Sequence, residues 1–251
     1  MLNDEELLRY SRQILLQHVD IAGQLRLKNS KVLIVGLGGL GSPVALYLAA
    51  AGAGELYLAD FDRLDLSNLQ RQIVHDSSAL GALKVQSAQA RLHALNPQIA
   101  VHTVSDKLDQ DNLPVLLQSV DLVLDCTDNF TIRGQLNAAC FAAGKVLISG
   151  AAIRTDGQIS VYDPGNSESP CYHCVFGDGA AEGLTCSEAG VLGPLVGLVG
   201  SLQALEALKI LAGFGEPLIG RLLLVDALSS RFRELKIRRD PGCSVCAVRH
   251  A

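Results

Sequence analysis

An aliphatic run that breaks off into glycines, VLIVGLGGLGS at residues 32–42, constrains this chain more than any other feature. The aliphatic part predicts a buried strand over 31–36, and the stretch 42–52 predicts the helix that follows it. A strand, a glycine turn and a helix in this order are typical of α/β proteins that bind nucleotides. In such proteins the backbone of the turn approaches a phosphate and the helix N-terminus faces it. The sequence therefore predicts a phosphate site at the turn.

Four glycines form this turn: Gly36, Gly38, Gly39 and Gly41. The first, second and fourth fit G-x-G-x-x-G, and the third is additional. The next predicted strand, 55–60, ends in Asp60, which is placed to bind ribose hydroxyls. Taken alone, these features also fit an NAD-dependent dehydrogenase, or a glycine turn that only packs against a sheet.

The segment after this acid, DFDRLDLSNLQRQ, is rich in polar and charged side chains. The candidates for nucleotide binding are Asp62, Asn68, Arg71, Gln72 and, on the next predicted helix, Lys84. Backbone amides serve a diphosphate well, whereas a triphosphate carries more charge and calls for cations. Arg71 and Lys84 would supply those cations, so the segment favours ATP over NAD. The alternative is a solvated charged loop.

A third motif, LDCTDNF at residues 124–130, follows another predicted strand. Open α/β sheets bind ligands beyond the carboxyl ends of their strands, so we expect this motif near the nucleotide. Asp128 is a candidate ligand for Mg²⁺, and Asn129 a candidate to hydrogen-bond a phosphate or the backbone. The alternative for Asp128 is an N-cap of the following helix.

Apolar runs and helical patterns alternate along the first 150 residues. Strands are predicted over 31–36, 55–60, 100–104, 121–126 and 145–152, and helices over 42–52, 82–95, 109–118 and 130–144. This alternation predicts an α/β fold of the Rossmann-like type, with a mostly parallel sheet and helices on both faces. Later in the chain, 157–163 and 220–237 predict antiparallel strands of a second sheet region. Residues 4–28 predict one or two surface helices.

An uncharged apolar run, AGVLGPLVGLVGSLQAL, occupies residues 189–205. It is short for a membrane span and is interrupted by Gly and Pro, so we expect a buried helix. The N-terminus opens acidic and lacks the apolar core of a signal peptide, which predicts a cytoplasmic protein. The net charge of -5 argues against nucleic acid or an acidic membrane as a partner.

Four of the seven cysteines form two C-x-x-C pairs, Cys171 with Cys174 and Cys243 with Cys246. Without a secretion signal, such pairs favour metal over disulfides. Four thiolates suit tetrahedral Zn²⁺, and a site whose four ligands all come from the protein is structural rather than catalytic. A redox dithiol is the alternative.

The remaining cysteines have other surroundings. Cys126 and Cys140 fall in an apolar strand and an apolar helix, and we expect both in the core. Cys186 follows the glycine-rich stretch GDGAAEG and is a candidate reactive thiol. The six histidines are scattered, and we interpret His75 and His93 as surface or packing residues.

The motifs taken together resemble those of a known family. GLGGLGS, ADFDRLDLSNLQRQ, LDCTDN, GAAIRTDGQISV, CSEAGVLGP and the paired C-x-x-C motifs are similar to those of the bacterial relatives of ubiquitin-activating (E1) enzymes. These relatives are adenylyltransferases that activate small sulfur-carrier proteins. The resemblance implies one E1-like domain over 1–251. Its parts would be N-terminal helices in 1–30, a nucleotide-binding part in 31–150, and a carrier-binding and zinc part in 151–251.

The resemblance also implies a reaction and roles for individual residues. The carrier's C-terminal Gly-Gly carboxylate would be joined to AMP, with ATP and Mg²⁺ as cofactors and pyrophosphate as a product. The positions that match the family's ATP site are Gly39, Asp60, Asn68, Arg71, Lys84 and Asp128. Arg12, in RYSRQ, matches an arginine that reaches the active site of the partner subunit in the family's homodimer. The implied catalytic set is Arg12, Arg71, Lys84 and Asp128.

Two branches of the family remain open. SGAAIRTDGQISVYDP and GCSVC resemble most the branch that serves molybdenum cofactor biosynthesis, whose carrier is the small subunit of molybdopterin synthase. The thiamine branch shares most motifs and is the alternative. In that branch the cysteine that matches Cys186 can bond covalently to the carrier, whereas in the molybdenum branch it is dispensable. Outside the family, the alternatives are the dehydrogenase and a zinc-stabilised scaffold without ATP turnover.

Overall fold

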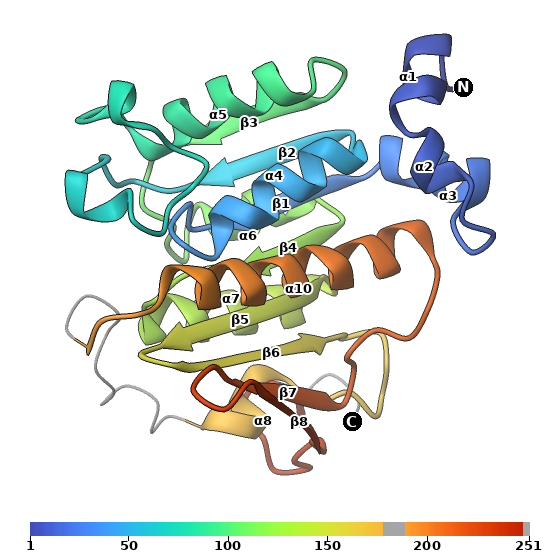
Figure 1. The fold of residues 1–251 in the computed structure, drawn as a ribbon. Helices are drawn as coiled ribbons and strands as arrows, with labels where there is room; N and C mark the ends of the chain where they lie inside the picture. Colours follow the sequence, from blue (N-terminus) through green and yellow to red (C-terminus); the bar gives the residue numbers. More distant parts are fainter. Residues whose placement is uncertain (178–188, 248–251) are drawn as a thin grey trace.

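The computed structural model describes residues 1–177 and 189–247, in which an eight-stranded sheet is covered by helices on both faces (Figure 1). The strands are β1 (Lys31–Val35), β2 (Glu55–Ala59), β3 (Ala100–Val104), β4 (Leu122–Asp125), β5 (Val146–Ile153), β6 (Asp156–Tyr162), β7 (Arg221–Asp226) and β8 (Arg231–Lys236). The helices are α1 (Asp4–Arg9), α2 (Ser11–Ile14), α3 (Asp20–Lys28), α4 (Gly41–Ala51), α5 (Lys84–Leu95), α6 (Leu113–Gln118), α7 (Phe130–Ala143), α8 (Tyr172–Phe176) and α10 (Gly193–Ala212). Short 3₁₀ turns occupy Leu66–Asn68 and Ser77–Ala79.

The strand order is β3-β2-β1-β4-β5-β6-β7-β8. The first five strands run parallel, and β6, β7 and β8 are antiparallel to their neighbours. The parallel part and the antiparallel continuation are both confirmed. The antiparallel strands do not start a second sheet, however, because β6 pairs directly with β5 along its length, from Leu147↔Tyr162 to Ile153↔Asp156.

The side chains of strand β1 point alternately into two apolar cores, one on each face of the sheet. Val32 and Ile34 point into the apolar cluster beneath α4, α5 and α10, whereas Leu33 and Val35 point into the cluster beneath α6 and α7. Successive side chains of a strand face opposite sides, so a strand covered on both faces must be continuously apolar. The predicted core cysteines fit this arrangement, because Cys126 lies in the first cluster and Cys140 in the second.

The uncharged run forms most of α10, which crosses the face of the sheet beside α4 (Figure 1). By length and hydropathy alone this helix could cross a membrane. Half of the apolar window is buried inside the protein, however, and Val199 and Ala207 are fully enclosed. The interpretation as a buried helix therefore agrees with its packing against the sheet.

Two of the segments predicted to be helical differ from the structure. Residues 4–28 form three short helices rather than one or two. Between the first two, Tyr10 is buried, and its hydroxyl accepts a hydrogen bond from Asn96 Nδ2 at 2.9 Å. The third begins at Asp20, whose φ is positive at 51°. The predicted helix 109–118 begins only at Leu113. The side chain of Asp109 instead accepts hydrogen bonds from the next backbone N–H groups and holds residues 109–112 as a turn.

Candidate active site

A large pocket opens where the chain reverses its direction of winding, between β1 and β4. Its volume is about 1250 Å³. In open α/β sheets this switch point is where ligands bind, beyond the carboxyl ends of the strands. Eleven of the residues predicted from the sequence to bind the nucleotide line it: Gly36, Gly38, Gly39, Asp60, Asp62, Asn68, Arg71, Gln72, Lys84, Asp128 and Asn129.

The glycine turn is shaped by close backbone packing. A Cβ atom at Gly41 would lie 1.9 Å from the carbonyl oxygen of Gly36, so the turn closes only with glycine there. Gly41 does not line the pocket and supports the turn from behind. A Cβ at Gly39 would lie 2.7 Å from Val196 Cγ2 of α10. The additional glycine therefore lets the apolar helix pack against the turn.

Asp60 holds this turn through its carboxylate. Its oxygens accept hydrogen bonds from Leu37 N at 2.7 Å and from Asp62 N at 2.9 Å. Burial raises the pKa of Asp60, although Lys84 and the two backbone N–H groups oppose that effect. The side chain thus has a structural task in addition to the predicted contact with ribose.

The two predicted cations differ in their surroundings. Lys84 is 6% exposed, and its Nζ lies 2.8 Å from Asp62 Oδ2. Arg71 is partly exposed and donates to the carbonyl oxygen of Ser67 at 3.2 Å. The carboxylate of Asp62 pairs with Lys84 and holds its ammonium group at the pocket wall. Both cations line the same pocket, so the fold brings together Arg71 and Lys84, which are 13 positions apart in the sequence.

Gln72 carries a polar atom without a partner. Its side-chain Oε1 is buried and makes no hydrogen bond within the part of the chain that the structure describes. Its Nε2 faces the glycine turn, 3.6 Å from where a Cβ of Gly38 would lie. A buried polar group normally has a partner, so this amide is suited to a bound ligand.

The loop after β4 separates the roles of two neighbouring residues. Asn129, not Asp128, caps α7, because Asn129 Oδ1 accepts from Thr131 N at 2.9 Å and from Ile132 N at 3.3 Å. Asp128 is exposed, and its carboxylate has no hydrogen-bond partner among residues 1–177 and 189–247. The capping alternative for Asp128 is therefore wrong, and its oxygens are available to a cation.

Sequence analysis missed the buried polar network behind this loop. Arg133 is 4% exposed and donates to the carbonyl oxygens of Thr127 and Gly150. Its Nη1 also lies 3.2 Å from Ser149 Oγ and 3.5 Å from Asp125 Oδ2. Asp125 Oδ1 in turn accepts from Thr127 N at 3.1 Å. The Thr127 residue is thus held at both its N–H and its carbonyl group, directly before Asp128.

His75 supports the glycine turn from behind. His75 Nε2 lies 3.0 Å from the carbonyl oxygen of Leu37, and its Nδ1 lies 2.9 Å from Ser87 Oγ. A carbonyl only accepts, so Nε2 carries the proton and Nδ1 accepts from the hydroxyl. Burial lowers the pKa of His75, which favours this neutral ring. The interpretation of His75 as a packing residue holds, but it packs against the predicted phosphate site.

Arg12 lies apart from the pocket of its own chain. It is exposed on α2, which sits beside the end of the sheet opposite to the glycine turn (Figure 1). Cys186 lies outside the described residues. The sequence had given no indication that Arg231 and Arg233, on β8, would line the far end of the pocket. They enter it only because β7 and β8 extend the same sheet.

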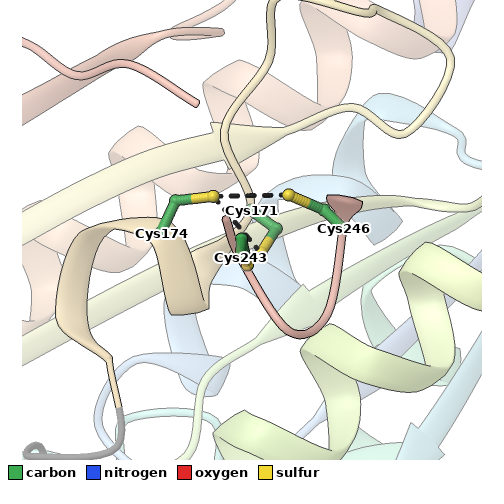
Figure 2. Close-up of side chains that lie close together, drawn as sticks. All are labelled: Cys171, Cys174, Cys243 and Cys246. Atoms are coloured by element: carbon green, nitrogen blue, oxygen red, sulfur yellow. Dashed lines mark hydrogen bonds between the residues drawn. The ribbon is translucent and has the colours of Figure 1, made fainter. Parts of the chain in front are cut away.

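The four paired cysteines converge on one point, as Figure 2 shows. The sulfur atoms lie 3.8 Å apart for Cys171–Cys174, 3.6 Å for Cys171–Cys243 and 3.4 Å for Cys174–Cys246. Zinc–sulfur bonds of about 2.3 Å in tetrahedral geometry place sulfur atoms about 3.8 Å apart. The arrangement therefore fits a four-thiolate metal centre.

The ionisation of these thiols is uneven. Burial opposes ionisation of Cys243, but backbone N–H groups of Val245 and Cys246 favour the thiolate and lower its pKa to about 6. Burial and the neighbouring thiols raise the pKa of Cys246 to about 11, and burial also raises that of Cys171. The thiol of Cys243 is thus ready to bind a cation at neutral pH, and the thiols of Cys171 and Cys246 would ionise as the metal binds.

Known proteins are similar to this chain in sequence and in fold. The ThiF family model matches residues 10–245. The chain is 54% identical over 248 residues to the molybdopterin-synthase adenylyltransferase of Escherichia coli (strain K12), and the match spans 98% of each chain. It is 46% identical to the adenylyltransferase and sulfurtransferase MOCS3 of Drosophila sechellia, covering 98% of this chain and 55% of that protein.

Among solved structures, the fold is similar to that of E. coli MccB described with ATP. The TM-score is 0.82 at 25% identity, over 95% of this chain and 74% of that chain. A structure of PaaA gives the same TM-score at 26% identity, over 95% of this chain and 76% of that one.

Proposed function

The chain belongs to the ThiF family, and we propose that it is an ATP-dependent adenylyltransferase for a ubiquitin-like sulfur-carrier protein. The carrier's C-terminal Gly-Gly carboxylate would attack the α-phosphate of ATP, forming an acyl-adenylate and releasing pyrophosphate. The observation that carries the proposal is the convergence of the glycine turn, Asp60, Arg71, Lys84 and Asp128 on one pocket. The curated relatives named adenylyltransferases favour this reaction over the dehydrogenase alternative.

The size of the pocket supports two substrates. Pockets for one small ligand are typically about 300–1,000 Å³. The volume here, about 1250 Å³, exceeds that range, and the pocket continues from the glycine turn to β7 and β8. We infer that the nucleotide lies at the turn and that the carrier's tail enters along the antiparallel strands.

The chemistry requires charge stabilisation rather than a base. A C-terminal carboxyl group has a pKa of roughly 3.3–3.7, so it is already an anion at neutral pH. It must approach an anionic phosphate while pyrophosphate leaves with additional charge. Lys84 and Arg71 supply positive charge at the pocket wall, and the pocket holds the two reacting groups together. Positioning and electrostatics would therefore account for most of the rate.

We propose two metals with separate tasks. Mg²⁺ would be held by Asp128, whose exposed carboxylate is not used by the cap of α7, and would neutralise phosphate charge. Zn²⁺ would be held by Cys171, Cys174, Cys243 and Cys246 and would stabilise the fold. With four protein ligands, that centre has no open position for a substrate.

The carrier that we propose is the small subunit of molybdopterin synthase. Support comes from the relatives in Escherichia coli and Salmonella typhimurium, at 54% and 50% identity, which are named molybdopterin-synthase adenylyltransferases. The carrier of the thiamine pathway is the alternative that the experiment below must distinguish. The six described cysteines are free thiols, which suits a reducing compartment and supports action in the cytoplasm.

We further propose a homodimer built from single-domain protomers. Strands from residues 31–150 and 151–251 share one sheet, which supports a single domain. Arg12 is exposed and lies away from the pocket of its own chain, so a second protomer would have to receive it. Exposed apolar side chains nearby, Leu8 and Leu15, support a contact surface at these helices.

The test is pyrophosphate–ATP exchange with each purified carrier in turn, the molybdopterin-synthase small subunit and the thiamine carrier. Exchange with the first alone is expected. Exchange with the thiamine carrier alone would change the pathway, and exchange with both would indicate a shared activator. A carrier that lacks the terminal Gly-Gly is the negative control. If neither carrier supported exchange, the proposed function would be contradicted.

Variants test the cations in the same assay. Arg71→Ala and Lys84→Ala should fold normally and lose exchange. Arg63→Ala is the matched control, since Arg63 lies in the same charged segment, its side chain donates to the carbonyl oxygen of Gly81, and it does not line the pocket. Normal exchange in either pocket variant would refute the role assigned to that residue.

A further inference from the structure

Helix α7 joins the two centres described above. Its N-terminal cap, Asn129, belongs to the loop that carries Asp128, and Phe141 near its other end packs with Cys171, Cys243 and Cys246. The helix has 14 residues, a length of about 21 Å at 1.5 Å per residue. One rigid element therefore touches both the pocket and the four-cysteine centre.

The contacts of α7 follow one side of the helix. Asn129, Arg133, Asn137 and Phe141 are spaced four apart, and such positions lie one above the other. The last three are all buried. Arg133 fixes the carbonyl of Thr127 before the pocket loop, as described above. The same side of the helix thus bonds to the loop at one end and faces the cysteines at the other.

Asn137 provides the polar contact at the cysteine end. It is 2% exposed; its Nδ2 donates to Cys171 Sγ at 3.6 Å, and its Oδ1 accepts from Tyr172 N at 2.8 Å. An N–H donor stabilises the charged form of a sulfur ligand and fixes its direction. The hydrogen bond to Tyr172 ties the backbone beside that ligand to the same side chain.

We propose that Asn137 is a positioning residue that couples the four-cysteine centre to the Asp128 loop through α7. With metal bound, Cys171 is fixed, Asn137 is held by two bonds, and α7 keeps its register against the sheet. Without metal, the cysteine end of α7 loses this anchor, and the loop at the other end is held less firmly. The proposal depends on the proposed function only for the identity of the nucleotide, because the measurements below need no carrier.

The first measurement is metal retention. Asn137→Ala should lose metal to a chromophoric chelator with an affinity about 10–100-fold weaker than that of the native protein. Asn137→Asp keeps an acceptor for Tyr172 N but replaces the donor with a negative charge beside the sulfur, so it should also lose affinity. Cys140→Ala is the matched control, since Cys140 is buried on α7 but belongs to a different apolar cluster. Retention equal to the native protein in both Asn137 variants would overturn the proposal.

The second measurement is amide hydrogen exchange, followed by NMR on the full chain with and without metal. The N–H groups of Thr131 and Ile132, which are bonded to Asn129, should exchange at least about tenfold faster once metal is removed. The N–H of Leu37, which is bonded to Asp60 in the glycine turn, should stay protected. Unchanged exchange at Thr131 and Ile132 would overturn the proposal. An equal change at Leu37 would also overturn it, because the effect would then be general loosening.

The third measurement is binding of a non-hydrolysable ATP analogue. Metal-free native protein and metal-loaded Asn137→Ala should both bind it more weakly, whereas Cys140→Ala should bind it as the native protein does. Native-like binding by metal-free protein would overturn the coupling, even if the chain still carried out pyrophosphate–ATP exchange when loaded. Conversely, a protein that binds the analogue in this metal-dependent way but activates neither carrier would refute the proposed function alone.

Discussion

The two loops that meet at the pocket are held in different ways. The glycine turn after β1 is closed by backbone contact, with Gly41 against the carbonyl of Gly36. Its polar supports are hydrogen bonds to Leu37, from the backbone N–H to the Asp60 carboxylate and from the neutral His75 ring to the carbonyl. The loop after β4 is held by a buried ion pair, Asp125 with Arg133, both less than 5% exposed. One edge of the sheet thus combines closure by steric contact on one side with a buried ion pair on the other.

This difference has an energetic consequence. A steric closure fails when an atom is added, whereas a buried ion pair fails when one partner is removed, because the remaining charge is then stranded in a low-dielectric site. The two loops should therefore respond to opposite kinds of substitution, and they should also differ in their response to pH.

The largest effect is expected from Arg133→Leu. This change removes the donor to Thr127 and leaves the Asp125 carboxylate buried without its cation, which costs about 3–5 kcal/mol. Urea unfolding would measure the loss. The double variant Arg133→Leu with Asp125→Asn should recover part of it, since the stranded charge is then gone. If the double variant is no more stable than the single one, the charge is not the cause.

Gly41→Ala tests the steric side of the comparison. The added Cβ would meet the carbonyl oxygen of Gly36 at 1.9 Å, and overpacking of this kind costs about 1–3 kcal/mol, occasionally more. Gly38→Ala is the control within the same turn, because its Cβ would come no closer than 3.6 Å to Gln72. Gly38→Ala should unfold at the same midpoint urea concentration as the native protein, although its added methyl group narrows the pocket. Equal stability of the two variants would show that the turn is not closed by contact.

The same contrast explains what the sequence could predict. The glycine turn was predictable because a steric requirement selects glycine at particular positions, and Gly36 and Gly41 carry that requirement in the sequence itself. Most strands were likewise predictable from continuous apolar runs, as in β1. The parallel direction of the first five strands also followed from the alternation of strands and helices, and the antiparallel continuation followed from the end of that alternation after residue 150.

The supports of the other loop were not predictable. Arg133 falls within a helical pattern, and nothing local shows that it turns inward, because its partners lie on β4, on β5 and at the Thr127 carbonyl. Arg231 and Arg233 reach the pocket only through the pairing of β7 and β8 with the parallel part of the sheet. Such sites depend on pairings distant in sequence, which residue patterns alone do not give.

Asn129→Ala should have a moderate effect on the β4 loop. It removes the acceptor for Thr131 N and Ile132 N, and loss of such a cap costs typically about 1 kcal/mol. Asn129→Gly should lower the free energy of unfolding by only roughly 0.3 kcal/mol. Thermal or urea unfolding of both variants would measure the difference. A loss as large as that of Arg133→Leu would mean that the cap, rather than the ion pair, holds the loop.

The smallest effect concerns pH and the glycine turn. Burial lowers the pKa of His75 in the folded chain below the ordinary histidine value of about 6.5. As the pH falls below about 6.5, the unfolded chain therefore takes up a proton that the folded chain resists, and stability decreases from there toward the lower, folded pKa. Above that window the contribution is complete.

His75→Gln removes this titration and should flatten the decline. The free energy of urea unfolding, measured at several pH values from neutral to mildly acidic, should fall less steeply in the variant than in the native protein. His93→Gln, on the exposed side of α5, is the control and should leave the native slope. Within residues 1–177 and 189–247, no histidine is a hydrogen-bond or ion-pair partner of Asp125 or Arg133, so Arg133→Lys should also keep that slope. Parallel slopes in His75→Gln and the native protein would show that this ring does not make the glycine turn the acid-sensitive side of the pocket.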